Sequence, residues 1–357
     1  MKKKSRPHAT LADVAQRAGV GQTTVSRVIN GAHKVSPETL ERVNKVIREL
    51  GYHPSQAARS LKGETTMTIG LILPRIADPF FASCAEAAQA VARSHGHLLI
   101  VAATGYDWQT EMDQIYTLLR YRVDGILLAP LDSASKRLAQ VVDEINIPVV
   151  TFDHPLTKAH VQSVVVDNYG GALSATRHLI EHGRRRILCL GGDARLYTIR
   201  QRQKGYKAAM LDAGLTPIIS DSANDYEGVE KAIRAAFLTK EPIDSIFGVR
   251  NLISIYAFQA LQMLELRIPQ DVALVGFDDF ELACTLRPAV TVVKQPVEAL
   301  GTQAASLLFE QMRQRATKPL RGRPKLEQLK TSLIVRSSCG CHSTSSVAQA
   351  RSAIGII

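Results

Sequence analysis

The residues from Thr10 to Asn30, TLADVAQRAGVGQTTVSRVIN, constrain this chain more than any other stretch. Thr10 can cap a helix that Gly19 ends, because glycine adopts the left-handed conformation of a tight exit. A second helix can begin three residues later, after Gly21, which is the spacing of a helix-turn-helix. Apolar residues recur three or four positions apart and predict the packed faces of both helices: Leu11, Val14, Ala15, Ala18, Val25, Val28 and Ile29.

The outer face of the second helix would carry polar side chains. Amide, hydroxyl and guanidinium groups of this kind read base edges and contact phosphates. They are Gln22, Thr23, Thr24, Ser26 and Arg27. A third helix is predicted from Ser36, as N-cap, through Pro37 in the first turn to about Leu50, with Gly51 ending it. The alternative is an ordinary helical hairpin inside a larger core.

Positive charge is concentrated in the same region, which argues against that alternative. The first 62 residues contain twelve Lys and Arg and four Asp and Glu, a net charge of +8 out of +11 for the chain. A basic patch on a small helical unit is the electrostatic signature of a phosphate-binding surface. The sequence therefore predicts double-stranded DNA as a partner of the N-terminal region.

The segments TLADVAQRAGV, TTVSRVIN and GYHPSQAARSLKG resemble the DNA-binding head of the LacI/GalR family of bacterial transcription regulators. The resemblance extends to about residue 341 and implies an all-α helix-turn-helix head followed by an α/β, two-lobed core of periplasmic-binding-protein type I. It implies a homodimer on operator DNA, in the cytoplasm with the nucleoid, and a leucine at position 61 that wedges into a central base step. The DNA-binding residues expected in this way are Thr10, Leu11, Gln22, Thr23, Thr24, Ser26, Arg27, Asn30, Ala58, Leu61 and Lys62.

After Thr66, short apolar runs alternate with longer helical stretches. Continuous apolar strands between helices are typical of parallel sheets covered on both faces. Nine strands in about 265 residues favour two α/β subdomains over one sheet. The predicted strands are 67–73, 97–103, 124–129, 147–152, 162–166, 186–192, 243–249, 272–277 and 290–294. Residues 318–328 are polar and contain prolines, so they predict an exposed loop.

The resemblance also implies how the chain is divided. The expected parts are a head at 1–52, a hinge helix at 53–64, an N-lobe at 65–165, a C-lobe at 166–294, a return to the N-lobe at 295–329, a final strand segment of the C-lobe at 330–341 and a disordered tail at 342–357. The tail contains no leucine heptad and so gives no support for a tetramer-forming coiled coil.

Polar residues at strand ends predict a ligand site between the lobes, because α/β sheets bind ligands at the carboxyl ends of their strands. Asp153 and Asp278 end strands and Arg250 follows one, and the resemblance implies ligand contact by an aspartate and an aromatic in Asp78-Pro79-Phe80-Phe81 and by an arginine at Arg202. The residues expected to contact a small effector are therefore Asp78, Phe80, Phe81, Asp153, Arg202, Arg250 and Asp278. For Asp78 the alternative is a helix cap before Pro79. Many family members have Asn-Asp where this chain has Arg250-Asn251. Arg250 and Arg202 together would suit a carboxylate or phosphate on the ligand. Three aspartates would instead bind hydroxyls, so the expected effector is a sugar or a sugar acid.

Other classes of protein are disfavoured. The chain lacks the glycine fingerprint of dinucleotide-dependent enzymes, the nucleophile elbow of hydrolases and the H-E-x-x-H pair of metalloproteases, so we expect no enzyme and no cofactor. A solute-binding transport component would need a signal peptide and no basic head. No apolar run approaches the roughly 20 residues that span a bilayer. Cys84 and Cys189 read as core residues, and Cys339 and Cys341 as a reduced pair, since no fourth metal ligand has the right spacing.

Overall fold

The computed structural model describes residues 9–29, 35–52, 65–315 and 325–341. The chain divides into two compact units, Met1–Thr66 and Met67–Ile357. Four of the predicted DNA-binding residues lie outside the described residues: Asn30, Ala58, Leu61 and Lys62. The predicted hinge helix and tail lie outside them as well. Within the described part of the chain, no helix combines the length and apolar character that a membrane span requires.

The first unit contains the three predicted helices, α1 (Leu11–Ala18), α2 (Gln22–Ile29) and α3 (Pro37–Leu50). A capping box begins α1, since the Asp13 amide donates to the Thr10 hydroxyl and the Thr10 amide donates back to the Asp13 carboxylate. Gly19, in the left-handed conformation, ends α1, and Ser36 caps α3. These local signals, and the turn between α1 and α2, confirm the predicted helix-turn-helix.

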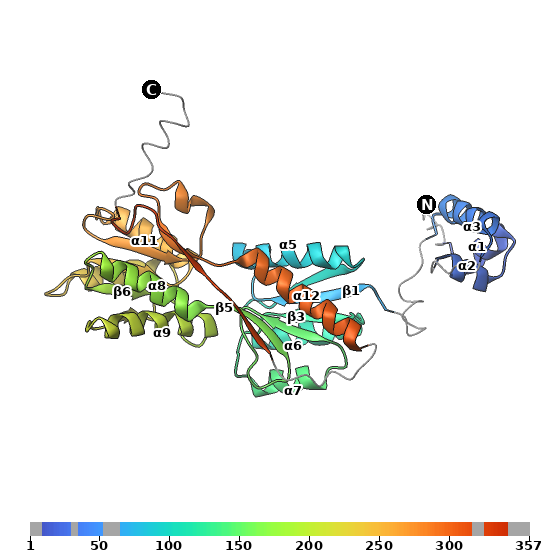
Figure 1. Ribbon diagram of the computed structural model, residues 1–357, viewed down its shortest axis with the longest axis horizontal. Helices are drawn as coiled ribbons and strands as arrows, with labels where there is room; N and C mark the ends of the chain where they lie inside the picture. The colour runs from blue at the N-terminus through green and yellow to red at the C-terminus, as the bar shows by residue number, and fades with distance from the viewer. Residues whose placement is uncertain (1–8, 30–34, 53–64, 316–324, 342–357) are drawn as a thin grey trace, which may run out of the picture. The chain divides into compact units, whose positions relative to one another are not determined.

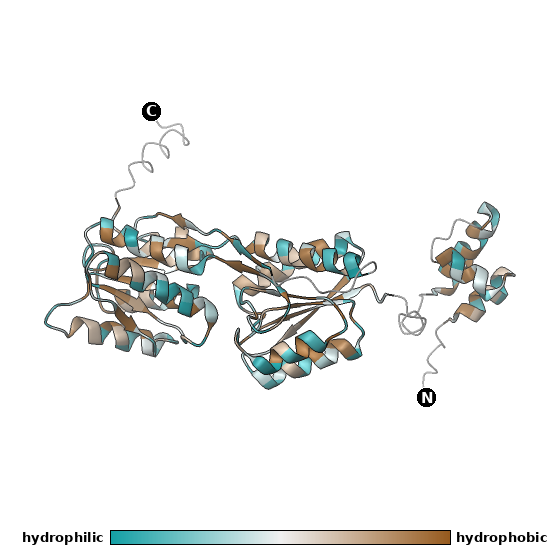
Figure 2. Ribbon diagram, turned by 60° about the horizontal axis from the view of Figure 1, so that its bottom comes forward, coloured by the Kyte–Doolittle hydropathy of each residue, from teal (hydrophilic) through white to brown (hydrophobic). Residues whose placement is uncertain are grey.

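Apolar side chains from all three helices form one small core in this unit. Val14 of α1, Val25 of α2 and Val43 of α3 are fully buried, and Tyr52 closes the cluster after α3. Figure 2 shows the hydrophobic and hydrophilic residues of these short helices separated onto different faces. This packing leaves the polar side of α2 free to meet another molecule.

The second unit contains two six-stranded sheets. The first has the order β11-β5-β4-β3-β1-β2 and the second β12-β10-β9-β8-β6-β7. Every pairing is parallel except that of β12 with β10. The strands are β1 (Thr68–Leu73), β2 (Leu98–Ala103), β3 (Gly125–Leu128), β4 (Val149–Phe152), β5 (Gln162–Val166), β6 (Ile187–Leu190), β7 (Ile218–Ser220), β8 (Ser245–Gly248), β9 (Ala273–Phe277), β10 (Thr291–Lys294), β11 (Leu326–Leu329) and β12 (Ser332–Ile334).

Helices cover both faces of each sheet. In the first sheet, α5 (Pro79–Ser94) and α12 (Val297–Arg315) pack on one face, and α6 (Trp108–Arg120) and α7 (Lys136–Glu144) on the other (Figure 1). In the second sheet, α8 (Asn168–Glu181) and α9 (Tyr197–Asp212) lie opposite α10 (Tyr226–Phe237) and α11 (Asn251–Met263). A short 3-10 helix, η1 (Glu281–Cys284), follows β9. This double cover is why strands such as β4 are buried over their whole length.

The nine predicted strands are all present, and three further strands lie at or near the sheet edges. The predicted exposed loop at 318–328 is wrong for its last three residues, because β11 begins at Leu326 and pairs in parallel with β5. Its side chains alternate between exposed and half-buried, as an edge strand allows. An edge strand with a polar face has the composition of a loop, which is why the apolar-run criterion missed it.

The chain passes between the two sheets three times. It leaves the first sheet after β5, returns after β10 through α12, and passes back between β11 and β12. In each sheet the strand order reverses direction beside the first strand of that sheet, β1 or β6. Loops at the carboxyl ends of strands near such a reversal are the usual place for a ligand.

Candidate functional site

The outer face of α2 carries the side chains predicted to read DNA. Gln22, Thr23 and Arg27 are exposed, while Thr24 and Ser26 are half-buried. The opposite face of the same helix contributes its two buried valines to the core of the head. Amide, hydroxyl and guanidinium groups are thus presented together on one accessible helix face, which is the arrangement that a major groove requires.

Thr10 and Leu11 lie at the start of α1. The Thr10 hydroxyl donates to the Asp13 carboxylate at 2.7 Å, and hydrogen bonds from Thr10 hold the pKa of Asp13 below its usual value. Leu11 is half-buried against the head core. Both residues therefore have a structural role in the head, and a phosphate contact by Thr10 would share the hydroxyl with the cap.

All seven predicted effector residues line one cavity of about 70 Å³ between the two sheets of the core. Loops and helix starts that follow β1, β4, β6, β8 and β9 bring them together. The full lining is Pro74, Asp78, Phe80, Phe81, Tyr106, Asp153, His154, Leu196, Thr198, Ile199, Arg202, Arg250, Asn251, Asp278 and Gln295. Such a convergence of polar groups, with two phenylalanines beside them, is what a small polar ligand needs.

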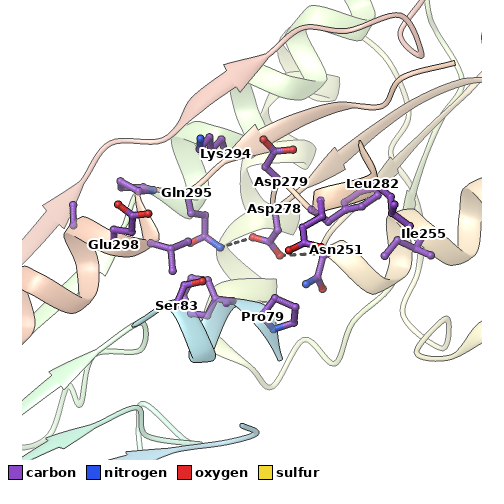
Figure 3. Close-up of a pocket in the computed structure, with 16 residues that line it drawn as sticks. Pro79, Ser83, Asn251, Ile255, Asp278, Asp279, Leu282, Lys294, Gln295 and Glu298 are labelled. Carbon is purple, nitrogen blue, oxygen red and sulfur yellow. Dashed lines mark hydrogen bonds between the residues drawn. The ribbon is translucent and has the colours of Figure 1, made fainter. Parts of the chain in front are cut away.

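Asp278 is the acceptor at the centre of the site. Its carboxylate accepts hydrogen bonds from the backbone N–H of Asn251 at 3.2 Å and from the side-chain amide of Gln295. Figure 3 shows the carboxylate pointing between these two residues. Ser83 and Pro79 face it from α5. A groove of about 690 Å³ adjoins the small cavity, and the two share Phe80, Asn251, Asp278 and Gln295.

Arg202 is buried and already has several partners. Its Nε donates to Asn168 Oδ1 at 2.7 Å and its Nη1 to the Val249 carbonyl at 2.7 Å. The guanidinium also lies 3.5 Å from the Asp278 carboxylate and 3.7 Å above the Phe277 ring. Burial lowers the pKa of Arg202, and Asp278 and Asp153 oppose that shift. Arg202 therefore stabilises the wall of the cavity that the second sheet and its helices form, and it also lines the cavity.

Asp153 and His154 form an adjacent buried pair. The Pro130 carbonyl can only accept, so the 2.7 Å contact places a proton on His154 Nδ1. His154 Nε2 then faces Asp153 Oδ2 at 3.3 Å and Thr198 Oγ1 at 3.4 Å. Burial raises the pKa of Asp153, while His154 and Arg202 lower it.

Backbone strain is concentrated around the same cavity. Six non-glycine residues among those described have positive φ, and three of them line the site: Tyr106 at 63°, Asp153 at 62° and Asp278 at 74°. A left-handed backbone is costly for a residue with a Cβ, although aspartate tolerates it better than most. Strain of this kind is retained where it positions a functional side chain.

Two buried polar atoms in the cavity have no hydrogen-bond partner. Five such side-chain atoms occur among the described residues, and Arg250 Nε and Gln295 Oε1 both belong to this lining. Arg250 is held in place by its Nη2, which donates to the Asn224 carbonyl at 3.1 Å. An unpartnered donor and an unpartnered acceptor in one cavity are groups that a ligand would satisfy.

Asp78 combines the structural role and the location expected for ligand contact. Its carboxylate caps α5 by accepting from the Phe80 amide at 3.1 Å, as the alternative interpretation predicted. It also lines the cavity, where burial raises its pKa, with Asp278 contributing and Arg250 opposing. A capping carboxylate keeps free acceptor positions, so the two roles are compatible.

Sequence reasoning did not select several residues of the lining, notably His154, Thr198, Asn251 and Gln295. All four directly follow a strand or open the next helix, like the residues that were selected. The strand-end rule applied without a preference for aspartate, arginine and phenylalanine would have found them.

Two family models match the chain. Residues 10–55 match the bacterial regulatory proteins of the lacI family, and residues 66–327 match the periplasmic binding proteins and sugar binding domain of the LacI family. The ribose operon repressor of Haemophilus influenzae is 35% identical over 308 residues, covering 85% of this chain and 92% of the relative.

Solved structures agree with this assignment. A complex of the transcriptional regulator CelR with cellobiose has a TM-score of 0.68 and 32% identity, over 92% of this chain and 99% of the other. The lac repressor dimer bound to operator and the anti-inducer ONPF has a TM-score of 0.81 and 25% identity, over 93% of this chain and 99% of the other.

Proposed function

The chain belongs to the LacI family of transcriptional regulators. From this premise we propose that it is a homodimeric repressor and that a sugar or sugar acid controls its affinity for the operator, by weakening or by strengthening it. The family consists of DNA-binding regulators and not of enzymes. The observation that carries the proposal is the combination, in one chain, of a polar recognition-helix face with a cavity that contains three carboxylates and an unpartnered guanidinium nitrogen.

We infer that the head contacts DNA mainly through the outer face of α2. Gln22, Thr23 and Arg27 are the base-reading candidates because they are exposed, and Thr24 and Ser26 support them. We assign Thr10 and Leu11, at the start of α1, to contacts with the DNA backbone. Asn30, Ala58, Leu61 and Lys62 stay as predictions from the sequence, since they lie outside the described residues.

Two copies of the head are needed for a useful operator. One recognition helix contacts few base pairs, and symmetric dimers double the site and its specificity. The lac repressor dimer that resembles this chain is bound to operator, which supports the same arrangement here. Because operators belong to the chromosome, we propose a cytoplasmic, nucleoid-associated location.

The effector cavity favours a polyhydroxylated ligand. Carboxylates accept hydrogen bonds from hydroxyl groups, and Phe80 and Phe81 offer apolar rings to the carbon face of a sugar. The similar CelR is known as a complex with cellobiose. We assign ligand contact to Asp78, Phe80, Phe81, Asp153, Arg202, Arg250 and Asp278. A cavity of about 70 Å³ is far below the roughly 300 Å³ at which ligand pockets begin, so we propose that the two lobes move apart when the ligand enters.

Arg250 decides between a neutral sugar and a sugar acid. Arg202 is occupied by protein acceptors, whereas Arg250 keeps a buried Nε without a partner. A carboxylate on the effector would supply an acceptor for that Nε and a charged partner for the guanidinium. We therefore prefer a sugar acid over a neutral sugar.

We also propose the domain division expected from the sequence. It assigns residues 1–52 to the head, 53–64 to the hinge, 65–165 and 295–329 to the N-lobe, and 166–294 and 330–341 to the C-lobe, with 342–357 as a tail. Each lobe would then be completed by a segment that returns late in the chain.

Operator selection from random duplexes tests the first part of the proposal. We expect a near-palindromic site, bound by two chains, with affinity that falls steeply with salt because of the basic head. An asymmetric site bound by a single chain would contradict it. The selected duplex is then titrated by fluorescence anisotropy in the presence of matched sugars and sugar acids. At least one compound should change operator affinity, and a panel without any effect would contradict the effector assignment.

A further inference from the structure

A cluster of two histidines and a cysteine lies away from the effector cavity, at the other end of α8. His178 and His182 are four residues apart and therefore share one face of the helix end. Cys341 Sγ approaches both rings, at 3.3 Å from His178 Nε2 and 2.8 Å from His182 Nε2. The three ligand atoms all lie within 4.8 Å of one another.

The hydrogen bonding of His182 directs a lone pair at the sulfur. Its Nδ1 lies 2.8 Å from the His178 carbonyl oxygen, which can only accept, so the ring proton is on Nδ1. The neutral ring then presents the lone pair of Nε2 to Cys341. Fixing the tautomer through the far nitrogen is how proteins orient a histidine that binds a metal.

The spacing of these atoms is close to that of a tetrahedral metal site. With zinc–sulfur and zinc–nitrogen bonds of about 2.3 and 2.0–2.1 Å, the sulfur and nitrogen ligands stand about 3.6 Å apart. The His178 contact needs almost no adjustment, and the His182 ring can swing outward because its residue is exposed. An exposed edge also leaves room for ion entry and for a water as fourth ligand.

Cys339 has a different role from Cys341. It is fully buried, and its sulfur accepts from the Thr291 hydroxyl at 3.2 Å and approaches the Arg336 carbonyl at 3.4 Å. Its sulfur also has side-chain hydrogen bonds to His178 and Cys341, so Cys339 borders the cluster from its buried side. His182 and His178 precede Cys341 by 159 and 163 positions in the chain, so the spacing around the cysteines does not reveal this cluster.

We propose that His178, His182 and Cys341 bind one divalent transition-metal ion of the zinc type. A thiolate with two imidazoles selects such borderline-soft ions over Mg²⁺ and Ca²⁺, whose preferred ligands are oxygens. The ion would join the end of α8 to the segment that follows β12. It would thereby close a long loop of the chain and stabilise the second lobe.

The test uses the full-length protein, reduced with a phosphine that does not bind metals. Equilibrium dialysis should give one Zn²⁺ per chain for the wild type and for Cys284→Ser, a matched control that removes an exposed thiol elsewhere. His182→Ala and Cys341→Ser should each weaken Zn²⁺ binding by about 100-fold or more, because each removes a direct ligand. Even the loss of a residue that only hydrogen-bonds to a ligand typically lowers metal affinity by about 10–100-fold. Mg²⁺ should not compete.

The absorption spectrum of bound Co²⁺ independently identifies the ligands of the metal. Co²⁺ bound to the wild type should show the visible bands of a tetrahedral site and a thiolate-to-cobalt absorption that Cys341→Ser lacks. Zn²⁺ should also raise the melting temperature of the wild type and not of His182→Ala, which tests folding and binding together. Wild-type uptake no tighter than that of His182→Ala would show a hydrogen-bonded cluster that binds no metal. A cobalt spectrum without a thiolate band would exclude Cys341 as a ligand, and either result would overturn the proposal.

Discussion

Arg250 is the residue whose replacement best tests the identity of the effector. Its Nη2 is anchored on the Asn224 carbonyl, and its buried Nε has no partner in the cavity. Arg250→Gln keeps a similar length and an amide donor but removes the charge. The change therefore separates an effector with a carboxylate from one with hydroxyl groups alone.

The expected magnitudes differ because only a carboxylate uses the full charge of the guanidinium. Removing one partner of a buried charged pair costs 2–5 kcal/mol. We take about 3 kcal/mol for a sugar acid, which is a loss of about 150-fold in affinity. A neutral hydroxyl loses a single hydrogen bond to a charged donor, about 1.5 kcal/mol or roughly tenfold.

Calorimetry with an aldose and its corresponding acid measures both numbers on the full-length protein. Arg267→Gln is the matched control, because Arg267 is an exposed arginine of the same lobe that pairs only with Asp271 at the surface. Equal losses for both ligands in Arg250→Gln would refute the idea that Arg250 reads a charge. Unchanged affinities for both would remove Arg250 from the site.

Arg250→Gln has a second consequence at Asp78. Burial raises the pKa of Asp78 and Arg250 opposes that rise. Without the guanidinium, Asp78 takes up a proton at higher pH. The binding of a hydroxyl-rich ligand by ionised Asp78 should then begin to fail at a higher pH than in the wild type, which calorimetry at several pH values detects.

Four further predictions concern the head, the effector site, a buried carboxyl group and, from the sequence alone, Leu61. Arg27→Ala should cost about 1–3 kcal/mol on the selected operator if Arg27 reads a guanine, and much less on random DNA; equal losses in anisotropy titrations would mean phosphate contact only. Asp278→Asn, which tolerates the left-handed backbone, should abolish the effector response and leave operator affinity unchanged; a normal response would exclude Asp278 from the site. Burial raises the pKa of Glu111 from 4.5 to about 7, so the free energy of unfolding should fall by about 3 kcal/mol as pH rises from below 4.5 to above 7. Glu111→Gln should flatten that profile in urea denaturation, and an unchanged slope would contradict the assignment. Leu61→Ala should reduce operator bending in an energy-transfer assay with little change in salt dependence, and an unaltered bend would refute the wedge.

Much of the fold could be predicted because its signals are local. The capping box at Thr10 and the ends at Gly19 and Gly51 depend on hydrogen bonds and dihedral angles within a few residues. The buried parallel strands are recognisable because helices cover both faces, so their apolar runs are continuous. Strand β11 escaped prediction because only its pairing with β5 distinguishes an edge strand with polar residues from a loop.

The candidate effector residues were found for a similar reason. Chain direction brings the carboxyl ends of parallel strands to one edge, so polar residues just after strands, such as Asp153 and Asp278, converge without any knowledge of contacts. Phe80, Phe81 and Arg202 lie within helices, and the resemblance to the family pointed to them. What that rule could not supply was the partner of each group. Arg202 and Arg250 look equivalent in sequence, yet protein acceptors occupy the first while the second keeps a buried donor unpartnered.

The sequence by itself therefore determined the helices of the head and the sheet-forming segments and pointed to a candidate ligand site, since each depends on residues close together in the chain or on strand direction. The tertiary structure alone decided the left-handed backbones of Asp153 and Asp278, the burial of Arg250 Nε without a partner and the meeting of α8 with Cys341. These features arise between residues that are far apart in the chain or under strain imposed by their surroundings. Packing of the whole lobe is what holds them in place.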